Sequence, residues 1–226
     1  SHHFPTGIVT PAARRRQLLS WAAESPERYI IEDDYDSEFR FHSHPVPALL
    51  AMDRWGKVIY MNTFSKTLAP SIRISYMVLP PALMHQFREK LGFYSCTVPS
   101  FEQYTLARFL SGGWFEKHIN RMRKFYRTRR NRVIELLENS PFAEKITILE
   151  QDAGLHFLLR VDSPRSGPEL AALCAEAGIR VRCLEDYYEG RVPGWAEKCL
   201  VINYSGLQED TLAQVLDRLG RLVTES

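Results

Sequence analysis

The sequence has no long apolar run and no patterned cysteines. No stretch approaches the roughly 18 apolar residues that a membrane-spanning helix needs. The four cysteines are widely spaced and include no C-x-x-C pair, so neither a zinc site nor a disulfide framework is indicated. The formal net charge of +2 favours no partner of opposite charge, and the first residues lack the basic and apolar regions of a signal peptide. These absences predict a cytoplasmic protein with reduced thiols, no bound metal and no membrane contact.

The hydrophobic pattern divides the 226 residues into two parts joined by a long helix. Residues 1–113 mix short apolar strands with helices, residues 114–138 form the connecting helix, and residues 139–226 form a small α+β domain. The predicted fold class is therefore α/β followed by a smaller α+β domain. The strands expected in the first part are 29–31, 58–61 and 72–79, and those in the second are 146–149, 155–161, 179–183 and 199–204.

Reactive side chains follow two neighbouring strands where each strand ends. Asp33 belongs to the acidic cluster in which the strand at 29–31 ends, and Lys66 lies just past the strand at 58–61. Ligand sites of open α/β sheets collect at the carboxyl ends of the strands. We therefore expect the amine and the carboxylate to face one ligand pocket.

These residues and their neighbours are the groups that hold pyridoxal 5'-phosphate. This cofactor needs an amine that bonds to its aldehyde and a carboxylate that keeps its ring nitrogen protonated. Lys66 and Asp33 supply these groups, and Tyr35 can hydrogen-bond the phenolic oxygen of the ring. Donors suited to the phosphate dianion are the hydroxyls of Thr63 and Ser65 and the guanidinium of Arg73.

Each of these residues taken alone has a simpler interpretation. A lysine after a turn is usually a solvated surface charge. Arg73 taken alone fits an arginine that forms a salt bridge at the rim of a site. The acidic run from Glu32 to Glu38 is typical of a polar loop, and a calcium site is disfavoured because the EF-hand spacing and its glycine are absent. Their joint occurrence at consecutive strand ends favours the cofactor.

The sequence resembles the aminotransferase-like domain of MocR-type regulators. These belong to the GntR transcription factors, and the domain has the pyridoxal phosphate fold of type I. The matching segments are Ser-His-His-Phe-Pro-Thr-Gly (1–7), Ile-Ile-Glu-Asp-Asp-Tyr-Asp-Ser-Glu-Phe-Arg (30–40), Thr-Phe-Ser-Lys-Thr-Leu-Ala-Pro-Ser-Ile-Arg (63–73), His-Ile-Asn-Arg-Met-Arg (118–123) and Ala-Gly-Leu-His (153–156). The resemblance implies that Lys66 bonds to the cofactor, Asp33 pairs with the ring nitrogen and Tyr35 lies near the phenolic oxygen. It also implies that Ser65 and Arg73 hold the phosphate.

Two positions depart from ordinary aminotransferases. Phe4 stands where they have an asparagine before Pro-Thr-Gly, so one hydrogen bond to the cofactor is expected to be missing. The last strand, residues 200–204, lacks the arginine that binds a substrate carboxylate in those enzymes. Arg180 and Arg182 are candidate replacements, and each fits an exposed strand position equally well.

The resemblance also predicts that other parts of such a protein precede this sequence. The glycine-rich phosphate loop, the aromatic residue that stacks on the ring and the winged-helix domain of this family would all come before Pro5-Thr6-Gly7. We therefore expect residues 1–113 to be a remnant of the large cofactor-binding domain. Alone, the chain is expected to bind pyridoxal phosphate weakly or not at all.

The predicted function is effector sensing in a bacterial transcriptional regulator. The effector would be a small amino compound or pyridoxal phosphate itself, DNA would be bound through a domain outside this chain, and the protein would be a homodimer. Its lysine chemistry is expected to be regulatory rather than complete transamination. The alternatives are a true aminotransferase acting on an amino acid and a degenerate scaffold used only for dimerisation. The missing arginine in the last strand disfavours the enzyme.

The long helix carries many basic residues between Arg121 and Arg132. Ile119, Met122 and Val133 give the same helix an apolar face, which favours a solvated role for the charges. Contact with a DNA backbone or another domain is the alternative. His118 is expected to pack or cap rather than to bind a metal, because no second ligand stands at helical spacing.

Overall fold

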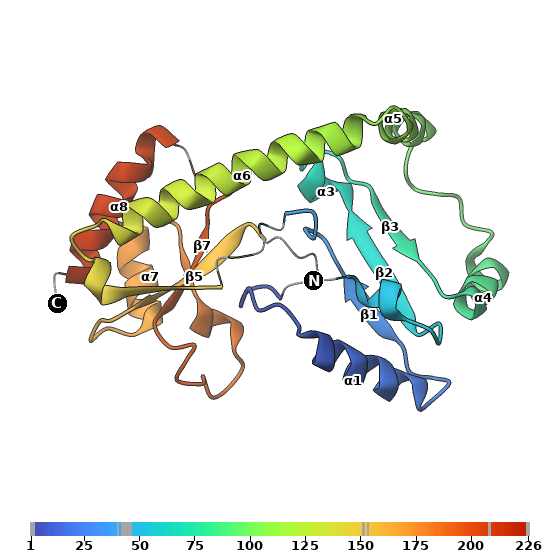
Figure 1. Ribbon diagram of the computed structural model, residues 1–226, viewed down its shortest axis with the longest axis horizontal. Helices are drawn as coiled ribbons and strands as arrows, with labels where there is room; N and C mark the ends of the chain where they lie inside the picture. Colours follow the sequence, from blue (N-terminus) through green and yellow to red (C-terminus); the bar gives the residue numbers. More distant parts are fainter. Residues whose placement is uncertain are drawn as a thin grey trace. The chain divides into compact units, whose positions relative to one another are not determined.

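The chain forms two compact units, which Figure 1 shows as a computed structural model. The structure describes residues 3–39, 41, 47–150, 152, 154–207 and 209–224. The first unit contains residues 9–38 and 47–123, and the second contains residues 3–8, 39 and 41 and the described residues from 124 onwards. The division falls within helix α6 (Trp114–Glu138), which extends over the residues predicted for the connecting helix. The assignment of residues 1–113 as a cofactor-binding remnant stays a prediction.

The first unit is built on a three-stranded sheet in the order β1-β2-β3. Strands β1 (Ile30–Asp33) and β2 (Val58–Thr63) are parallel, and β3 (Ser75–Val78) pairs with β2 in the antiparallel direction. The third strand is shorter than predicted. The backbone carbonyls of Ile72 and Ile74 instead accept hydrogen bonds from the turn after β2, so these residues do not continue the ladder.

Helices flank this sheet, and α1 and α2 both pack against it. The helices of the unit are α1 (Ala12–Ala23), α2 (Leu49–Met52), α3 (Phe64–Thr67), α4 (Pro81–Leu91), α5 (Ser100–Ser111) and the first part of α6. Leu19 of α1 packs with Leu49 and Val58 in a buried cluster. This cluster covers one face of the sheet near the start of β2.

The two faces of this sheet differ in chemistry. Side chains alternate across a strand, and residues paired between strands share a face. Glu32, Tyr60 and Asn62 lie on the side that also carries the buried Val58, which we call the network face. The opposite side, which we call the open face, carries Ile31, Asp33, Met61 and Met77, and Ile31 is 66% exposed there.

The second unit has a four-stranded antiparallel sheet in the order β4-β5-β7-β6. Its elements are β4 (Ile146–Leu149), β5 (His156–Val161), α7 (Gly167–Glu176), β6 (Arg182–Cys183), β7 (Cys199–Asn203), α8 (Glu209–Thr224) and the short 3-10 helices Ala143–Lys145 and Leu184–Tyr187. A buried cluster packs strands β5 and β7 against the 3-10 helix Leu184–Tyr187; it contains Leu158, Leu184, Cys199 and Val201. Among the described helices, none is long and apolar enough to cross a membrane.

Helix α7 begins with a capping box whose removal should lower stability. The Ser166 hydroxyl accepts the Glu169 amide at 3.4 Å, and the Glu169 carboxylate accepts the Ser166 amide at 2.7 Å. We expect Ser166→Ala to reduce the free energy of unfolding by about 1 kcal/mol, because the Glu169 amide loses its acceptor and the Glu169 carboxylate loses the Ser166 hydroxyl. Urea unfolding followed by circular dichroism measures this change. Ser100→Ala is the control, since Ser100 is exposed and α5 has no side-chain cap; an equal loss there would contradict the prediction.

Candidate functional site

The acidic run at the end of β1 places its carboxylates in two different environments. Glu32, Asp34 and Asp36 are buried, whereas Asp33 is exposed at the end of the strand. The Asp34 amide donates to the Met61 carbonyl at 2.9 Å, which extends the parallel pairing of β1 and β2 by one bond. Asp33 therefore stands on the open face at the carboxyl end of β1, where the sequence predicts a cofactor carboxylate.

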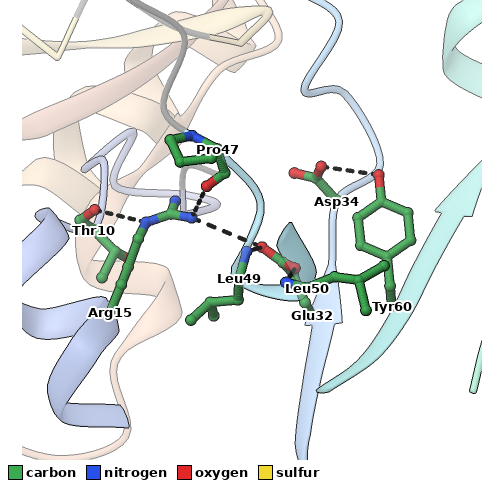
Figure 2. Close-up of polar contacts among 8 residues, drawn as sticks. All are labelled: Thr10, Arg15, Glu32, Asp34, Pro47, Leu49, Leu50 and Tyr60. Atoms are coloured by element: carbon green, nitrogen blue, oxygen red, sulfur yellow. Dashed lines mark hydrogen bonds and ion pairs between the residues drawn. The ribbon is translucent and has the colours of Figure 1, made fainter. Parts of the chain in front are cut away.

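Hydrogen bonds from other protein groups bind the carboxylates of Glu32 and Asp34, as Figure 2 shows. Glu32 accepts the backbone amides of Leu49 and Leu50 at 2.7 and 3.0 Å, so its carboxylate caps helix α2. The Arg15 guanidinium lies 3.8 Å from the same carboxylate, and both side chains are nearly inaccessible. Arg15 also donates to two backbone carbonyls, those of Thr10 and Pro47. These contacts give Glu32 a structural role.

Asp34 belongs to a polar network on the network face. The Tyr60 hydroxyl donates to Asp34 at 3.0 Å (Figure 2). The Asn62 side-chain amide donates to the Tyr60 oxygen at 3.1 Å and to Glu38 at 3.3 Å. Burial raises the pKa of the Tyr60 phenol, so this group remains a neutral donor. This network was not predicted from the sequence, although the alternation of Tyr60 and Asn62 in β2 was a possible signal.

Hydrogen bonds gather the predicted phosphate-binding residues around the turn after β2. Thr63 is the N-cap of α3, and its hydroxyl accepts the Ser65 amide at 3.2 Å. The Ser65 hydroxyl oxygen lies 3.2 Å from the Thr63 hydroxyl and accepts the Arg73 guanidinium at 3.1 Å. Two hydroxyls and one guanidinium thus lie together, and this donor set suits a phosphate dianion.

Lys66 is carried by the same turn. It lies in α3, one residue after Ser65, and it is exposed. Among the described residues, no side chain or backbone group binds its amine. His118 contacts the backbone of this turn, since its Nε2 lies 2.9 Å from the carbonyl oxygen of Thr67. Within the described ranges, no cluster of side chains suits a metal ion.

Tyr35 is half-buried close to the exposed end of β1. Burial is the main cause that raises the pKa of its phenol, and the charges of Asp36 and Asp33 raise it further. The charge of Asp33 raises the pKa of Tyr35 because the two side chains lie close together. A phenol with a raised pKa stays protonated at neutral pH, so it can donate a hydrogen bond to an anionic oxygen such as that of the pyridoxal ring.

Arg180 and Arg182 lie in the second unit beside a cavity of about 500 Å³. Both side chains are exposed, and Arg182 pairs in register with Val201 of the last strand. Tyr187, Asn203 and Phe4 also line this cavity. The Phe4 ring contacts His156 and Tyr187 edge-on at 5.3 and 5.5 Å between ring centroids, which gives this residue a packing role within its unit.

The sequence segments that carry the family resemblance lie partly outside the described residues. Of the segments quoted for the resemblance, Ser1, His2, Arg40 and Ala153 lie outside the described residues. The sequence model of the family "Aminotransferase class I and II" matches residues 1–219. The chain belongs to this family.

Known relatives and solved structures agree with this membership. The chain is 39% identical to the uncharacterized HTH-type transcriptional regulator YhdI of Bacillus subtilis (strain 168), over 97% of this chain and 46% of that protein. It is 33% identical to the probable rhizopine catabolism regulatory protein MocR of Rhizobium meliloti, over 97% of this chain and 43% of that protein. The kynurenine aminotransferase of Pyrococcus horikoshii, solved in complex with PMP, superposes with a TM-score of 0.78 at 29% identity, over 98% of this chain and 54% of that one.

These comparisons confirm the predicted fold and the resemblance. The α/β architecture is that of part of a pyridoxal phosphate-dependent transferase of fold type I, and the chain is similar to MocR-type regulators. The chain spans about half the length of the relatives that it matches. The roles of Lys66, Asp33, Tyr35, Thr63, Ser65 and Arg73 stay predictions.

Proposed function

We propose that this chain is the effector-sensing part of a pyridoxal phosphate-dependent transcriptional regulator. The main support is the turn from Thr63 to Lys66, where an exposed lysine directly follows the Ser65 of the phosphate-donor cluster. The exposed Asp33 ends the neighbouring parallel strand. The regulators named above add support for a role in transcription.

The donor set fits pyridoxal phosphate by its chemistry. When bound, this cofactor supplies an electrophilic aldehyde and a ring that withdraws electrons. Lys66 would bond to the aldehyde carbon, and Asp33 would hold a proton on the ring nitrogen. The Tyr35 phenol would donate to the phenolic oxygen. The phosphate would be bound by the hydroxyls of Thr63 and Ser65 together with the guanidinium of Arg73.

The effector in this proposal is a small amino compound or pyridoxal phosphate. An amine can displace Lys66 from the aldehyde, which frees the lysine side chain. Arg180 and Arg182, which line one cavity of the second unit, are the candidates for binding a carboxylate. Coupling to DNA requires that the effector prefer one of two arrangements of the whole protein. DNA binding through another domain, a homodimer and a cytoplasmic location are parts of the same proposal.

A true aminotransferase is the second candidate, favoured by the family membership. The two functions differ in the product that they release. With pyridoxal phosphate and an amino acid supplied together, an enzyme releases a keto acid and leaves pyridoxamine phosphate, whereas a sensor changes its absorbance without releasing keto acid. Chromatography of the products distinguishes the two. Stoichiometric keto acid would contradict the sensor and support the enzyme.

Arg73→Ala should weaken the binding of pyridoxal phosphate roughly tenfold or more. The guanidinium supplies the charge in the donor cluster, and a charged hydrogen bond contributes about 1.5–3 kcal/mol. The measurement is the cofactor concentration that gives half-maximal covalent labelling of Lys66 after borohydride reduction. Pyridoxal, which lacks the phosphate, should be unaffected by the substitution. Arg132→Ala is the control, because Arg132 is an exposed side chain paired with Glu135. An equal effect on both ligands would contradict a phosphate role for Arg73.

A further inference from the structure

A cavity in the first unit adjoins the turn that carries the predicted cofactor residues. It has a volume of about 590 Å³ and is bordered by β2, β3, α5 and the start of α6. Its lining includes Glu38, Tyr76, Leu106, Leu110 and Phe115. Of its lining, Asn62 and Tyr76 pair in register on the network face, and Thr63 and Ser75 pair on the open face. Of the predicted cofactor residues, only Thr63 borders this cavity.

The cavity contains one acidic side chain and, among its described lining, no basic one. One oxygen of the Glu38 carboxylate, Oε1, accepts the Asn62 amide at 3.3 Å. The other oxygen, Oε2, is buried and has no hydrogen-bond partner within the described residues. A buried acceptor left without a donor costs about 1–3 kcal/mol, and more when it is charged. A ligand that supplies a charged donor would offset this cost.

The remaining lining suits a cation with an apolar body. Phe64, Tyr76 and Phe115 contribute aromatic rings, whose faces attract ammonium groups. Leu106 and Leu110 supply aliphatic surface from α5. The volume is in the range of about 300–1,000 Å³ that is common for small-molecule sites. Anions are disfavoured, because the charged group here is a carboxylate.

We propose that this cavity binds a small organic amine as its ammonium cation, with Glu38 as the counter-charge. The site shares Thr63 with the predicted cofactor residues, and its occupation requires neither Lys66 nor pyridoxal phosphate. Burial raises the pKa of the Glu38 carboxyl, as expected for a carboxylate without a cationic partner. A bound ammonium would supply that partner.

The site also adjoins the turn that carries Lys66. The Asn62 side chain that binds Glu38 accepts the Thr63 amide at 2.6 Å. Thr63 in turn caps the helix that contains Lys66. Movement of Glu38 toward a ligand would therefore act on a residue that fixes the start of this turn.

The test uses 2-phenylethylamine as the probe and 2-phenylethanol as its neutral counterpart, with no pyridoxal phosphate added. Isothermal titration calorimetry on the whole chain should show that the amine binds at least tenfold more tightly than the alcohol. Glu38→Gln should remove this preference, whereas Glu116→Gln, which changes an exposed acid on α6, should preserve it. Equal affinities of the two probes for the unchanged protein, or no binding of the amine, would overturn the proposal.

Two further variants keep the test decisive if Glu38→Gln does not fold. Ala107→Phe fills the cavity and leaves Glu38 in place, so it should abolish binding of the amine. Lys66→Ala should bind the amine as tightly as the unchanged protein. Retained binding in Ala107→Phe, or lost binding in Lys66→Ala, would place the amine elsewhere and overturn the proposal. Because the assay contains no cofactor, its outcome is independent of the proposed regulatory function.

Discussion

Lys66→Ala should abolish the specific covalent attachment of pyridoxal phosphate to this protein. The amine of Lys66 has no partner among the described residues, and Lys66 directly follows Ser65, which belongs to the donor cluster with Thr63 and Arg73. Phosphate binding at that cluster would raise the local concentration of the aldehyde at this amine. Lys66 should therefore react well before the other lysines. Borohydride reduction followed by peptide mass spectrometry identifies the modified residue.

The control for this experiment is Lys90→Ala, which removes an exposed lysine of α4 and should leave the labelling unchanged. The affinity of the isolated chain is expected to be low, so the reaction should be run over a range of cofactor concentrations. Labelling spread evenly over the lysines, with no loss in Lys66→Ala, would contradict the assignment of Lys66. It would leave the family membership intact, because that rests on the match over residues 1–219.

Local patterns in the sequence predict much of this fold because periodicity is a local property. Strand β4 and helix α6 cover the predicted residues, since their apolar positions alternate or recur without interruption. Strand β6 contains only Arg182 and Cys183, although the apolar pattern begins at Ile179. The Ile179 amide instead donates to the Cys174 carbonyl at 2.7 Å and closes the end of α7. Such a competition between neighbouring elements cannot be read from alternation alone.

The candidate site can be predicted only partly from the sequence, because some of its contacts join residues far apart in the chain. The occurrence of Asp33, Lys66 and Arg73 in this order indicates the cofactor. Their places near the ends of strands predict which edge of the sheet they occupy. Sequence alone does not say which acid of the run stays exposed, because Glu32 is buried by amides 17 and 18 residues away. Similarly, His118 reaches the carbonyl of Thr67 from 51 residues away. Contacts at such separations depend on tertiary packing.

The buried pair of Arg15 and Glu32 should be the most costly polar contact to break in the first unit. Glu32→Ala leaves the Arg15 guanidinium, whose side chain is 2% exposed, without its carboxylate. It also removes the acceptor of two amides at the start of α2. Loss of one partner from a buried ion pair typically costs about 3–5 kcal/mol. We expect a loss of this size in the free energy of unfolding, measured by urea denaturation.

The matched control is Glu135→Ala, which breaks an ion pair between Glu135 and Arg132 on the surface of α6. That pair is closer, at 2.9 Å compared with 3.8 Å for Arg15 and Glu32, yet both of its side chains are about half exposed. Solvent screens such a pair, so its removal should cost less than about 1 kcal/mol. If distance decided the energy, the surface pair would be the stronger one. Equal losses in the two variants would mean that Glu32 is solvated in solution and that α1 does not pack against β1 as described.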